Sequence, residues 1–404
     1  MMSPKNVIAR IVLLIVYRVT AVFSKITGRR GKKKFTNSGY LCVIGTFHNP
    51  NWFFSHILPL ANCDCGKVVL ICDEQVSEVD NVIYECPPGW LSKILSRAGA
   101  KLVWSIRCGF KYKPDLYMGY HIFPAAVTAL IAARVFNRPA CYQDTSGPLE
   151  LAGGGWAAEN PLLVALGQPS KMIEKAVFAV VREFDLVVVR GRGAEQYILE
   201  AGYTRNLMII TGSVRDDSDC LSLDSRPFDL VFVGRLTEYK QPDRFLEVAH
   251  HLKRDIEGIR VAVIGDGPDA GMLNELAREL NIAENVEFFG RINNVEEIVS
   301  KSKVFILTSR WEGLSIAMIE AMSVGTVPSV TDVGDLKDLA RDQVCGCVVG
   351  FDDYLQMVPC ILELLKNNNK WNEYSAIARR DALAMSGRSS IIEKWNKGLR
   401  ALIE

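Results

Sequence analysis

The sequence of 404 residues lacks the features of several protein classes. It has no low-complexity tract, and 49% hydrophobic with 23% charged residues is a globular composition, long enough for two domains with separate cores. The longest uninterrupted apolar stretch near the N-terminus, Ile11 to Tyr17, is far shorter than the ~18 to 20 residues that span a bilayer. No A-x-A cleavage site follows it, which argues against a cleaved signal peptide.

Cysteine and histidine patterns of zinc sites are also missing. The pairs Cys63/Cys65 and Cys345/Cys347 have no second pair or nearby His at ligand spacing, so no metal site is expected. The eleven cysteines are scattered among apolar runs, which predicts buried thiols in a reducing cytosol (Cys42, Cys72, Cys108, Cys141 and Cys360, for example).

Acidic residues are absent from the first 34 positions, which carry nine Lys or Arg. The remaining residues carry 38 basic and 46 acidic side chains, so the body is not a nucleic-acid binder by charge. On a helical projection, polar side chains of this segment fall on one side and apolar ones opposite. Residues 7–34 therefore predict an amphipathic, basic segment in the interface of an anionic membrane. The alternative is a helix packed on the protein's own surface, followed by a solvated basic loop.

From about residue 40, β-branched runs alternate with amphipathic stretches, which is typical of parallel α/β sheets. We expect strands at, for example, "YLCVIG", "KLVW" and "DLYMGY", and again at "DLVFVG" and "VFILTS". The pattern predicts two Rossmann-like domains facing across a cleft, with function in the strand-to-helix loops. The expected division is a basic N-terminal segment, a first domain, a linker, a second domain and C-terminal helices that could cross back to the first domain (1–35, 36–213, 214–226, 227–373 and 374–404).

Two cations follow the first strand of the second half. In "VFVGRLTEYKQPDRFLEVAHHL", Gly234 and Arg235 end the strand and Lys240 precedes a helix. A guanidinium, an ammonium and a helix N-terminus together suit a diphosphate. A solvated Arg and Lys in a loop is the simpler interpretation of this pair alone. The later turn "GDGPDA" ends in Ala and so is not a G-x-G-x-x-G fingerprint.

Two carboxylates stand out in "SRWEGLSIAMIEAMSVGTVPSV". Glu312 follows a strand-like run, and Glu320 lies in an apolar helical run. We expect Gly313, Leu314 and Ser315 to form the first turn of that helix, with free amides for an anion. Glu312 could then reach sugar hydroxyls, and a buried Glu320 could accept hydrogen bonds from a ribose diol. The alternatives are a surface acid at Glu312 and a salt bridge at Glu320.

The ordered motifs "FVGRLTEYK", "VIGDGP", "NVEFFGRI" and "FILTSRWEGLSIAMIEAMSVGTVPSVTDVGD" resemble the C-terminal half of retaining glycosyltransferases of the GT-B fold, family four, over about residues 227–350. The resemblance implies sugar transfer from a nucleotide diphosphate sugar with retained configuration, without a metal or other cofactor. It implies a donor site in the second domain (Gly234, Arg235, Lys240, Gly290, Arg291, Ile292, Glu312, Gly313, Leu314, Ser315 and Glu320).

Within that resemblance, Arg235 and Lys240 match the diphosphate-binding pair and Glu312 the acid that contacts the donor sugar, while Glu320 matches the ribose ligand. His121 corresponds to a histidine of the N-terminal domain near the reaction centre, although the usual H-x-H arrangement is absent. Catalysis is thus expected to depend on Glu312, His121, Arg235 and Lys240.

The acceptor side is expected in the first domain, because that domain of the fold usually receives the acceptor. Candidate residues lie in "GTFHNPNWFF" and in "SGPLELAGGGWAAEN" (His48, Asn49, Asn51, Trp52, Gly153 and Gly154). The alternative for the glycines is a flexible loop.

The expected function is transfer to a saccharide or lipid-linked saccharide in cell-surface polysaccharide or glycolipid synthesis, at the cytoplasmic face of a membrane. Rival interpretations are a GT-B nucleotide-sugar epimerase, a phosphorylase, for which no cofactor-lysine signature is present, and a non-catalytic nucleotide-sugar-binding protein.

Overall fold

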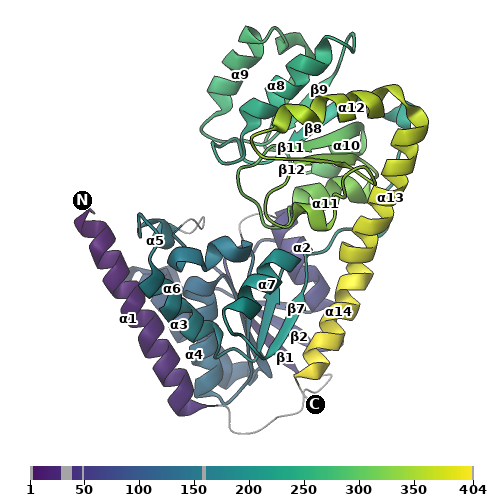
Figure 1. The fold of residues 1–404 in the computed structure, drawn as a ribbon. Coiled ribbons are helices and arrows are strands. Elements are labelled where there is room, and N and C mark those ends of the chain that lie inside the picture. The colour runs from purple at the N-terminus through teal and green to yellow at the C-terminus, as the bar shows by residue number, and fades with distance from the viewer. Residues whose placement is uncertain (1–2, 29–38, 48–49, 157–160, 403–404) are drawn as a thin grey trace. The chain divides into compact units, whose positions relative to one another are not determined.

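The structure, a computed structural model, describes residues 3–28, 39–47, 50–156 and 161–402. They form two compact units, one of residues 1–213 with 391–404 and one of residues 214–390. Each unit has its own parallel sheet with helices on both faces, as Figure 1 shows. The stretch expected as a linker, 214–226, belongs to the second unit, and buried Arg226 binds the backbone oxygens of Ser302 and Val324 there.

The first unit has a seven-stranded sheet in the order β3-β2-β1-β4-β5-β6-β7. Alternate residues of its strands face two cores, so that Leu41 and Val43 point to one side and Cys42 and Ile44 to the other. The elements are α1 (Pro4–Thr27), β1 (Tyr40–Ile44), α2 (Pro50–Ala61), β2 (Lys67–Ile71), β3 (Val82–Glu85), α3 (Gly89–Tyr112), β4 (Leu116–Tyr120), α4 (Val127–Val135), β5 (Ala140–Gln143), α5 (Pro161–Val164), α6 (Lys171–Val181), β6 (Leu186–Val189), α7 (Arg192–Glu200) and β7 (Asn206–Ile209).

The second unit has a six-stranded sheet in the order β10-β9-β8-β11-β12-β13. Its elements are β8 (Phe228–Val233), α8 (Pro242–Lys253), β9 (Val261–Ile264), α9 (Ala270–Glu279), β10 (Val286–Gly290), α10 (Val295–Ser300), β11 (Ser302–Leu307), α11 (Ile316–Ser323), β12 (Val327–Thr331), β13 (Cys347–Val349), α12 (Met357–Lys366) and α13 (Asn368–Ser386). Helix α14 (Arg388–Ala401) follows, and its Ile391, Trp395 and Leu399 pack in a core of the first unit.

Two further expectations, about local structure, are wrong. "KLVW", Lys101 to Trp104, is not a strand but the middle of α3, where Ala100, Lys101, Ser105 and Cys108 are buried at helical spacing. A four-residue apolar run fits either structure, and its neighbours decide. The expectation that all cysteines are thiols fails at Cys347 and Cys360, which form a disulfide between β13 and α12 with Cα atoms 6.4 Å apart.

Helix α1 packs on α6 and α4 through the side that carries Leu13, Tyr17, Thr20, Ala21 and Ser24. That side includes the hydroxyls of Tyr17, Thr20 and Ser24, so part of the polar side of the helix faces the protein, whereas Arg18 and Lys25 are exposed. Most of the exposed side is apolar (Val7, Ile8, Ile11, Val12, Ile15, Val19, Val22 and Ile26). By length and composition α1 could also cross a membrane, which the short Ile11–Tyr17 run did not indicate.

Candidate functional site

The strand order of the second sheet reverses between β8 and β11. From β8 the chain continues to β9 and β10 on one side, and from β11 to β12 and β13 on the other. Loops that follow two such strands diverge and leave a crevice at the carboxyl edge, where ligands bind in open α/β sheets. The loop Gly234–Gln241 follows β8, and the loop Thr308–Ser315 follows β11.

A charged pair joins these two loops. Lys240 Nζ lies 2.5 Å from Glu312 Oε1, and Ser309 Oγ donates to the same oxygen over 2.7 Å. The side chains of Lys240 and Glu312 are only 17% and 9% exposed. The backbone N–H of Arg310 also donates to the Tyr239 carbonyl over 2.8 Å, which ties the loops together. Glu312 is thus no surface acid, and the cation predicted for the diphosphate lies beside the acid predicted for the sugar.

Glycines let the loop backbones come this close. Gly334, at φ +56°, packs so tightly that a Cβ atom would lie 2.0 Å from the Glu312 carbonyl oxygen. Gly265, at φ +144°, would place a Cβ 1.8 Å from the Gly234 carbonyl oxygen. Only glycine fits such positions, because any side chain would collide with fixed backbone. These contacts hold the Glu312 loop and the end of β8 in place.

The helix after Glu312 begins later than expected. Ser315 is the N-cap of α11, and its Oγ accepts a hydrogen bond from the N–H of Met318 over 3.4 Å. Gly313 and Leu314 therefore precede the helix and do not form its first turn. A serine side chain favours the cap over the helical position because it satisfies an otherwise unpaired N–H. Leu314 is buried, and the Gly313 carbonyl accepts from the N–H of Asp335 over 3.3 Å.

Glu320 lies in the second turn of α11 and is half-buried. Burial, reinforced by the negative charge of Glu296, raises the pKa of this carboxyl to about 7. Among the described residues its carboxylate has no hydrogen-bond or ion-pair partner, so the alternative of an internal salt bridge is wrong. A carboxylate in this setting gains from donors that a ligand brings, such as hydroxyl groups.

The remaining donor-side candidates surround the same edge of the sheet. Arg235 is exposed directly after Gly234, whose N–H donates to the Ile264 carbonyl over 3.0 Å. Gly290 ends β10, and its carbonyl accepts from the N–H of Gly265 over 2.9 Å. After it come exposed Arg291 and half-buried Ile292, which packs on the core.

The first sheet also reverses its strand order, between β1 and β4, and His121 follows β4 there. His121 has the unusual φ of +65°. Its Nδ1 lies 2.6 Å from Thr145 Oγ1 and 3.3 Å from Glu150 Oε2, and the side chain is 42% exposed. Because an ionised carboxylate only accepts hydrogen bonds, this arrangement places the ring proton on Nδ1.

Glu150 is the buried centre of this cluster. It accepts hydrogen bonds from the backbone N–H groups of Ile122 and Thr145 and from the Thr145 hydroxyl. Burial alone would raise the pKa of Glu150, but His121 and these donors hold it below its usual value. Burial and the charge of Glu150 instead raise the pKa of neighbouring Asp144 well above its usual range. The pKa values of the two neighbouring carboxyls are thus shifted in opposite directions, that of Glu150 down and that of Asp144 up.

The acceptor candidates are placed unevenly. His48 and Asn49 lie outside the described residues. Asn51 and Trp52 are half-buried at the start of α2, where Arg190 lies over the Trp52 ring at 5.7 Å.

Gly153 and Gly154 are buried rather than part of a flexible loop. Their φ angles are +61° and +86°, and a Cβ on Gly154 would lie 2.7 Å from the Ile173 side chain on α6. The Gly153 N–H also donates to Glu174 over 3.1 Å. Their packing explains these glycines, and nothing in the contacts supports acceptor binding.

Two buried polar contacts of the first unit were missed by sequence reasoning. Glu150 stands within a stretch chosen for its glycines, and the contact to His121 spans 29 positions. Lys101 in α3 is buried, and its ammonium binds the Gly45 carbonyl at 2.8 Å and Asp73 at 2.9 Å, which fixes the loop after β1. Because "KLVW" was expected to be a strand, its lysine did not indicate a buried contact of this kind.

The chain is similar to known glycosyltransferases in sequence and in fold. The family described as "Glycosyl transferases group 1" matches residues 215–381. One curated relative, from Campylobacter jejuni, is the GalNAc-alpha-(1->4)-GalNAc-alpha-(1->3)-diNAcBac-PP-undecaprenol alpha-1,4-N-acetyl-D-galactosaminyltransferase. It is 31% identical over 45% of this chain and 51% of its own length. Another, the Escherichia coli UDP-Gal:alpha-D-GlcNAc-diphosphoundecaprenol alpha-1,3-galactosyltransferase, is 28% identical over 33% of this chain and 35% of its own length.

The chain spans less than two thirds of the length of each of these two relatives. Among solved structures, Anabaena HepE in complex with UDP-glucose superposes with a TM-score of 0.71 over 90% of this chain and 100% of that chain, at 14% identity. Likeness at this identity concerns the fold, and the fold is that of a two-domain GT-B protein.

Proposed function

We propose that this chain is a retaining glycosyltransferase, because residues 215–381 match the family "Glycosyl transferases group 1" and the fold is GT-B. It would move a hexose-type sugar from a nucleotide diphosphate sugar to a saccharide or lipid-linked saccharide. The observation that carries the proposal is the pair Lys240–Glu312, 2.5 Å apart at the strand-order reversal, with partnerless Glu320 following on α11. The two relatives named above act on undecaprenol-linked saccharides, which favours an acceptor of this class.

In this proposal the donor's diphosphate binds beside Lys240 and Arg235. Negative charge grows on the leaving diphosphate as the anomeric carbon gains oxocarbenium character, and preorganised cations stabilise that charge. These two side chains would serve in place of a divalent cation. Glu312, held by Ser309 and Lys240, would bind the donor sugar, and Glu320 would accept two hydrogen bonds from the ribose. We assign no general base, because the leaving phosphate can take the acceptor's proton.

We further propose a cytoplasmic enzyme attached to the inner face of a membrane through residues 7–34. The exposed apolar side of α1 supports this assignment for the described part of that segment. Acceptor contacts would come from the first unit, near His121, Asn51 and Trp52.

A thermal-shift screen of UDP-, GDP- and ADP-sugars tests the proposal first. One nucleotide class should stabilise the protein, and that donor should then support transfer to a lipid-linked saccharide. Glu320→Ala should weaken nucleotide binding, whereas Glu312→Ala should mainly slow transfer. Negligible effects of both substitutions on turnover would contradict the site.

The same screen separates the rivals. An epimerase would convert the stabilising nucleotide sugar without any acceptor. A non-catalytic binding protein would be stabilised by it and neither hydrolyse nor transfer it.

A further inference from the structure

Helix α3 exposes large apolar side chains that no part of the described first unit covers. Trp90, Ile94 and Phe110 are 62%, 70% and 71% exposed, and Leu95 and Val103 are exposed as well. The same helix is anchored inward by buried residues that include Leu91, Lys101 and Cys108. Exposed apolar residues are ordinary one at a time, but Trp90, Ile94 and Leu95 lie together before the backbone break at Ser96 (φ +66°), and such a group indicates a binding surface.

The charge of α3 limits the class of partner. The helix contains no Asp or Glu, and Lys93, Arg97, Arg107 and Lys111 accompany its apolar side chains. Arg107 and Lys111 pair with Glu85 of β3, whereas Lys93 and Arg97 lie beside the exposed residues at its beginning. A basic helix with Trp, Ile and Phe at its surface fits the interface of an anionic bilayer.

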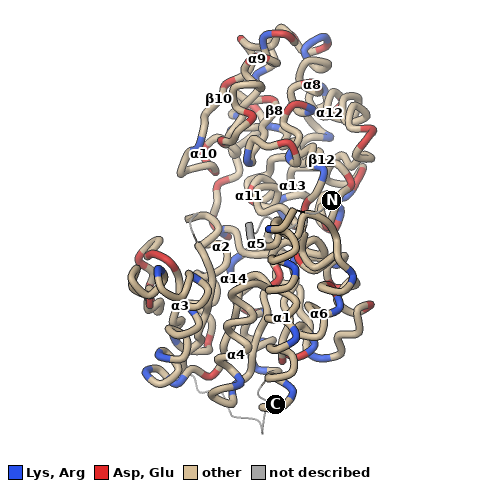
Figure 2. The backbone as a smooth tube through the Cα atoms, turned by 90° about the vertical axis from the view of Figure 1, so that its left-hand side faces the viewer, with Lys and Arg blue, Asp and Glu red and all other residues tan. Residues whose placement is uncertain are grey.

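Helices α3 and α1 both pack on α4, whose own residues are buried apart from Ile131 and Val135. Figure 2 shows α3, α4 and α1 next to one another. All three helices lack Asp and Glu. A bilayer is broad and anionic, so it suits two separate apolar helices without acids better than a compact protein partner does.

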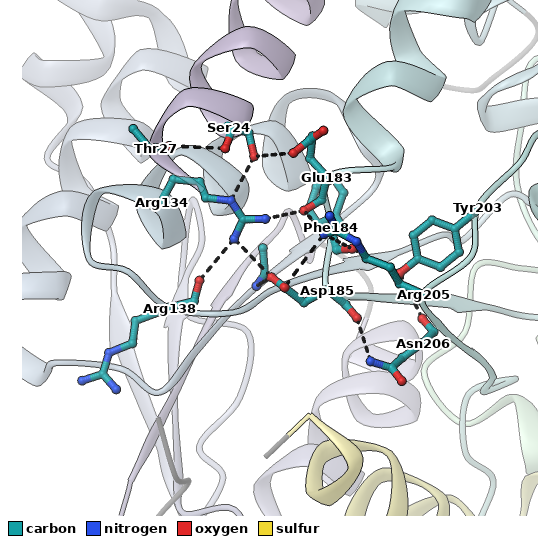
Figure 3. Close-up of polar contacts among 11 residues, drawn as sticks. Ser24, Thr27, Arg134, Arg138, Glu183, Phe184, Asp185, Tyr203, Arg205 and Asn206 are labelled. Atoms are coloured by element: carbon teal, nitrogen blue, oxygen red, sulfur yellow. Dashed lines mark hydrogen bonds and ion pairs between the residues drawn. The ribbon is translucent and has the colours of Figure 1, made fainter. Parts of the chain in front are cut away.

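The polar contacts that hold α1 to the first unit indicate that this helix would lie on a membrane rather than cross it. Figure 3 shows Ser24 of α1 between Arg134 and Glu183: Arg134 Nε donates to Ser24 Oγ over 2.9 Å, and Ser24 Oγ donates to Glu183 over 3.3 Å. Arg134 also pairs with Asp185 at 3.1 Å. At the other end, Arg10 donates to the Leu166 and Gln168 carbonyls. Pulling α1 into a bilayer core would break these bonds and leave buried charges without Ser24.

We propose that α3 is a second membrane-docking element, which acts with α1 to seat the first unit flat on an anionic lipid surface. The inference rests on the proposed function, since a lipid-linked acceptor would then be presented to the first unit at the membrane surface. Trp90, Ile94 and Leu95 would insert among the lipid headgroups, and Lys93 and Arg97 would meet their phosphates.

The test is co-sedimentation of the full chain with vesicles of phosphatidylcholine, with and without phosphatidylglycerol. The double variant Trp90→Ser/Ile94→Ser leaves α1 intact, and its partition coefficient should fall roughly tenfold or more. Lys93→Gln/Arg97→Gln should lose mainly the dependence on phosphatidylglycerol. The matched control is Leu199→Ser, because Leu199 is a 51% exposed apolar residue on α7 of the same unit.

A second readout locates the contact. Brominated lipids should quench tryptophan fluorescence of the wild type, and Trp90→Phe should reduce that quenching while partitioning persists. Unchanged partitioning of the double variant, or unchanged quenching of Trp90→Phe, would overturn the proposal. So would a dimer that forms without lipid and is lost in the double variant, because the surface would then join two copies of the chain. Stabilisation by the nucleotide sugar should be the same in every variant, so loss of docking is distinct from failure of the donor site.

Discussion

The strand-order reversals of the two sheets carry polar sites of opposite character. In the second unit Glu320 is half-buried without a partner, and Lys240 and Glu312 hold one another at the crevice. In the first unit Glu150 is completely buried and already accepts hydrogen bonds from Ile122 and Thr145. Unsatisfied groups favour a ligand that satisfies them, whereas satisfied ones fix a neighbouring side chain.

This difference assigns different tasks to the two units. The second unit has the groups that a charged, hydroxyl-rich donor would satisfy. In the first unit, Thr145 and Glu150 set the orientation of the His121 side chain through contacts to its Nδ1. Substitutions in the second unit should therefore act on binding and charge stabilisation, and substitutions behind His121 should act on its protonation.

The largest expected effect is that of Lys240→Met on sugar transfer. Removing a preorganised cation from a developing diphosphate should slow the reaction by roughly 100- to 1,000-fold. It also leaves Glu312, 9% exposed, without its ion-pair partner. Transfer would be measured with the donor found in the thermal-shift screen. Lys253→Met, at the far end of α8, is the matched control and should be nearly neutral. Comparable rates for both variants would break the assignment of the donor site to the second unit.

Glu320→Ala should weaken nucleotide binding by about 10- to 100-fold, since two hydrogen bonds to a charged group would be lost. Calorimetric titration with the nucleoside diphosphate measures this directly. Glu297→Ala on α10 removes an exposed acid that pairs with Lys301 and should leave the affinity unchanged. If the wild type bound a deoxyribose analogue of the nucleotide as weakly as Glu320→Ala binds the nucleotide itself, the contact would be assigned to the ribose hydroxyls. Equal nucleotide affinity of the wild type and Glu320→Ala would refute the contact.

These donor-side residues could be predicted from the sequence, because the members of each pair follow the same strand. Arg235 with Lys240, and Glu312 with Glu320, are separated by a few positions, so local spacing carries the signal. The alternation of apolar runs likewise predicted two parallel sheets. Both sheets are parallel, in two separate units.

The contacts of the first unit were harder to predict from the sequence, because they join positions that are far apart along the chain. Lys101 binds the Gly45 carbonyl 56 residues away, and Glu150 meets His121 from 29 residues away. The helical projection of the N-terminal segment separated polar from apolar residues, but the projection does not say which side the fold covers. That choice depends on Arg134 and Glu183, which bury Ser24.

Glu150→Gln tests the role of the first unit. A neutral amide in place of the ionised carboxylate no longer fixes the proton on His121 Nδ1, so transfer should slow by about tenfold and its pH profile should shift. Glu174→Gln is the control, because Glu174 also accepts a backbone N–H, that of Gly153, but is remote from His121 in the hydrogen-bond pattern. A variant that loses thermal stability but keeps the wild-type pH profile would show that Glu150 is structural only.

The smallest effect concerns stability and sharpens the contrast between the two carboxylates. The pKa of Glu320 is raised to about 7 from 4.5, so the folded state holds this proton more tightly than the unfolded state. The protonated carboxyl therefore stabilises the folded state fully below about pH 4.5, and this stabilisation is lost as the pH rises through about 7.

Glu320→Gln cannot ionise, so its advantage in free energy of unfolding over wild type should grow between about pH 5 and 8. Allowing for partial exposure, we expect on the order of 1–2 kcal/mol, or a few degrees in Tm. Thermal unfolding of both proteins across this pH range, without nucleotide, measures the difference. A constant difference would mean that the Glu320 carboxyl titrates normally. A growing difference together with weaker nucleotide binding would show that the ionised carboxylate costs stability in the free protein and serves the ligand.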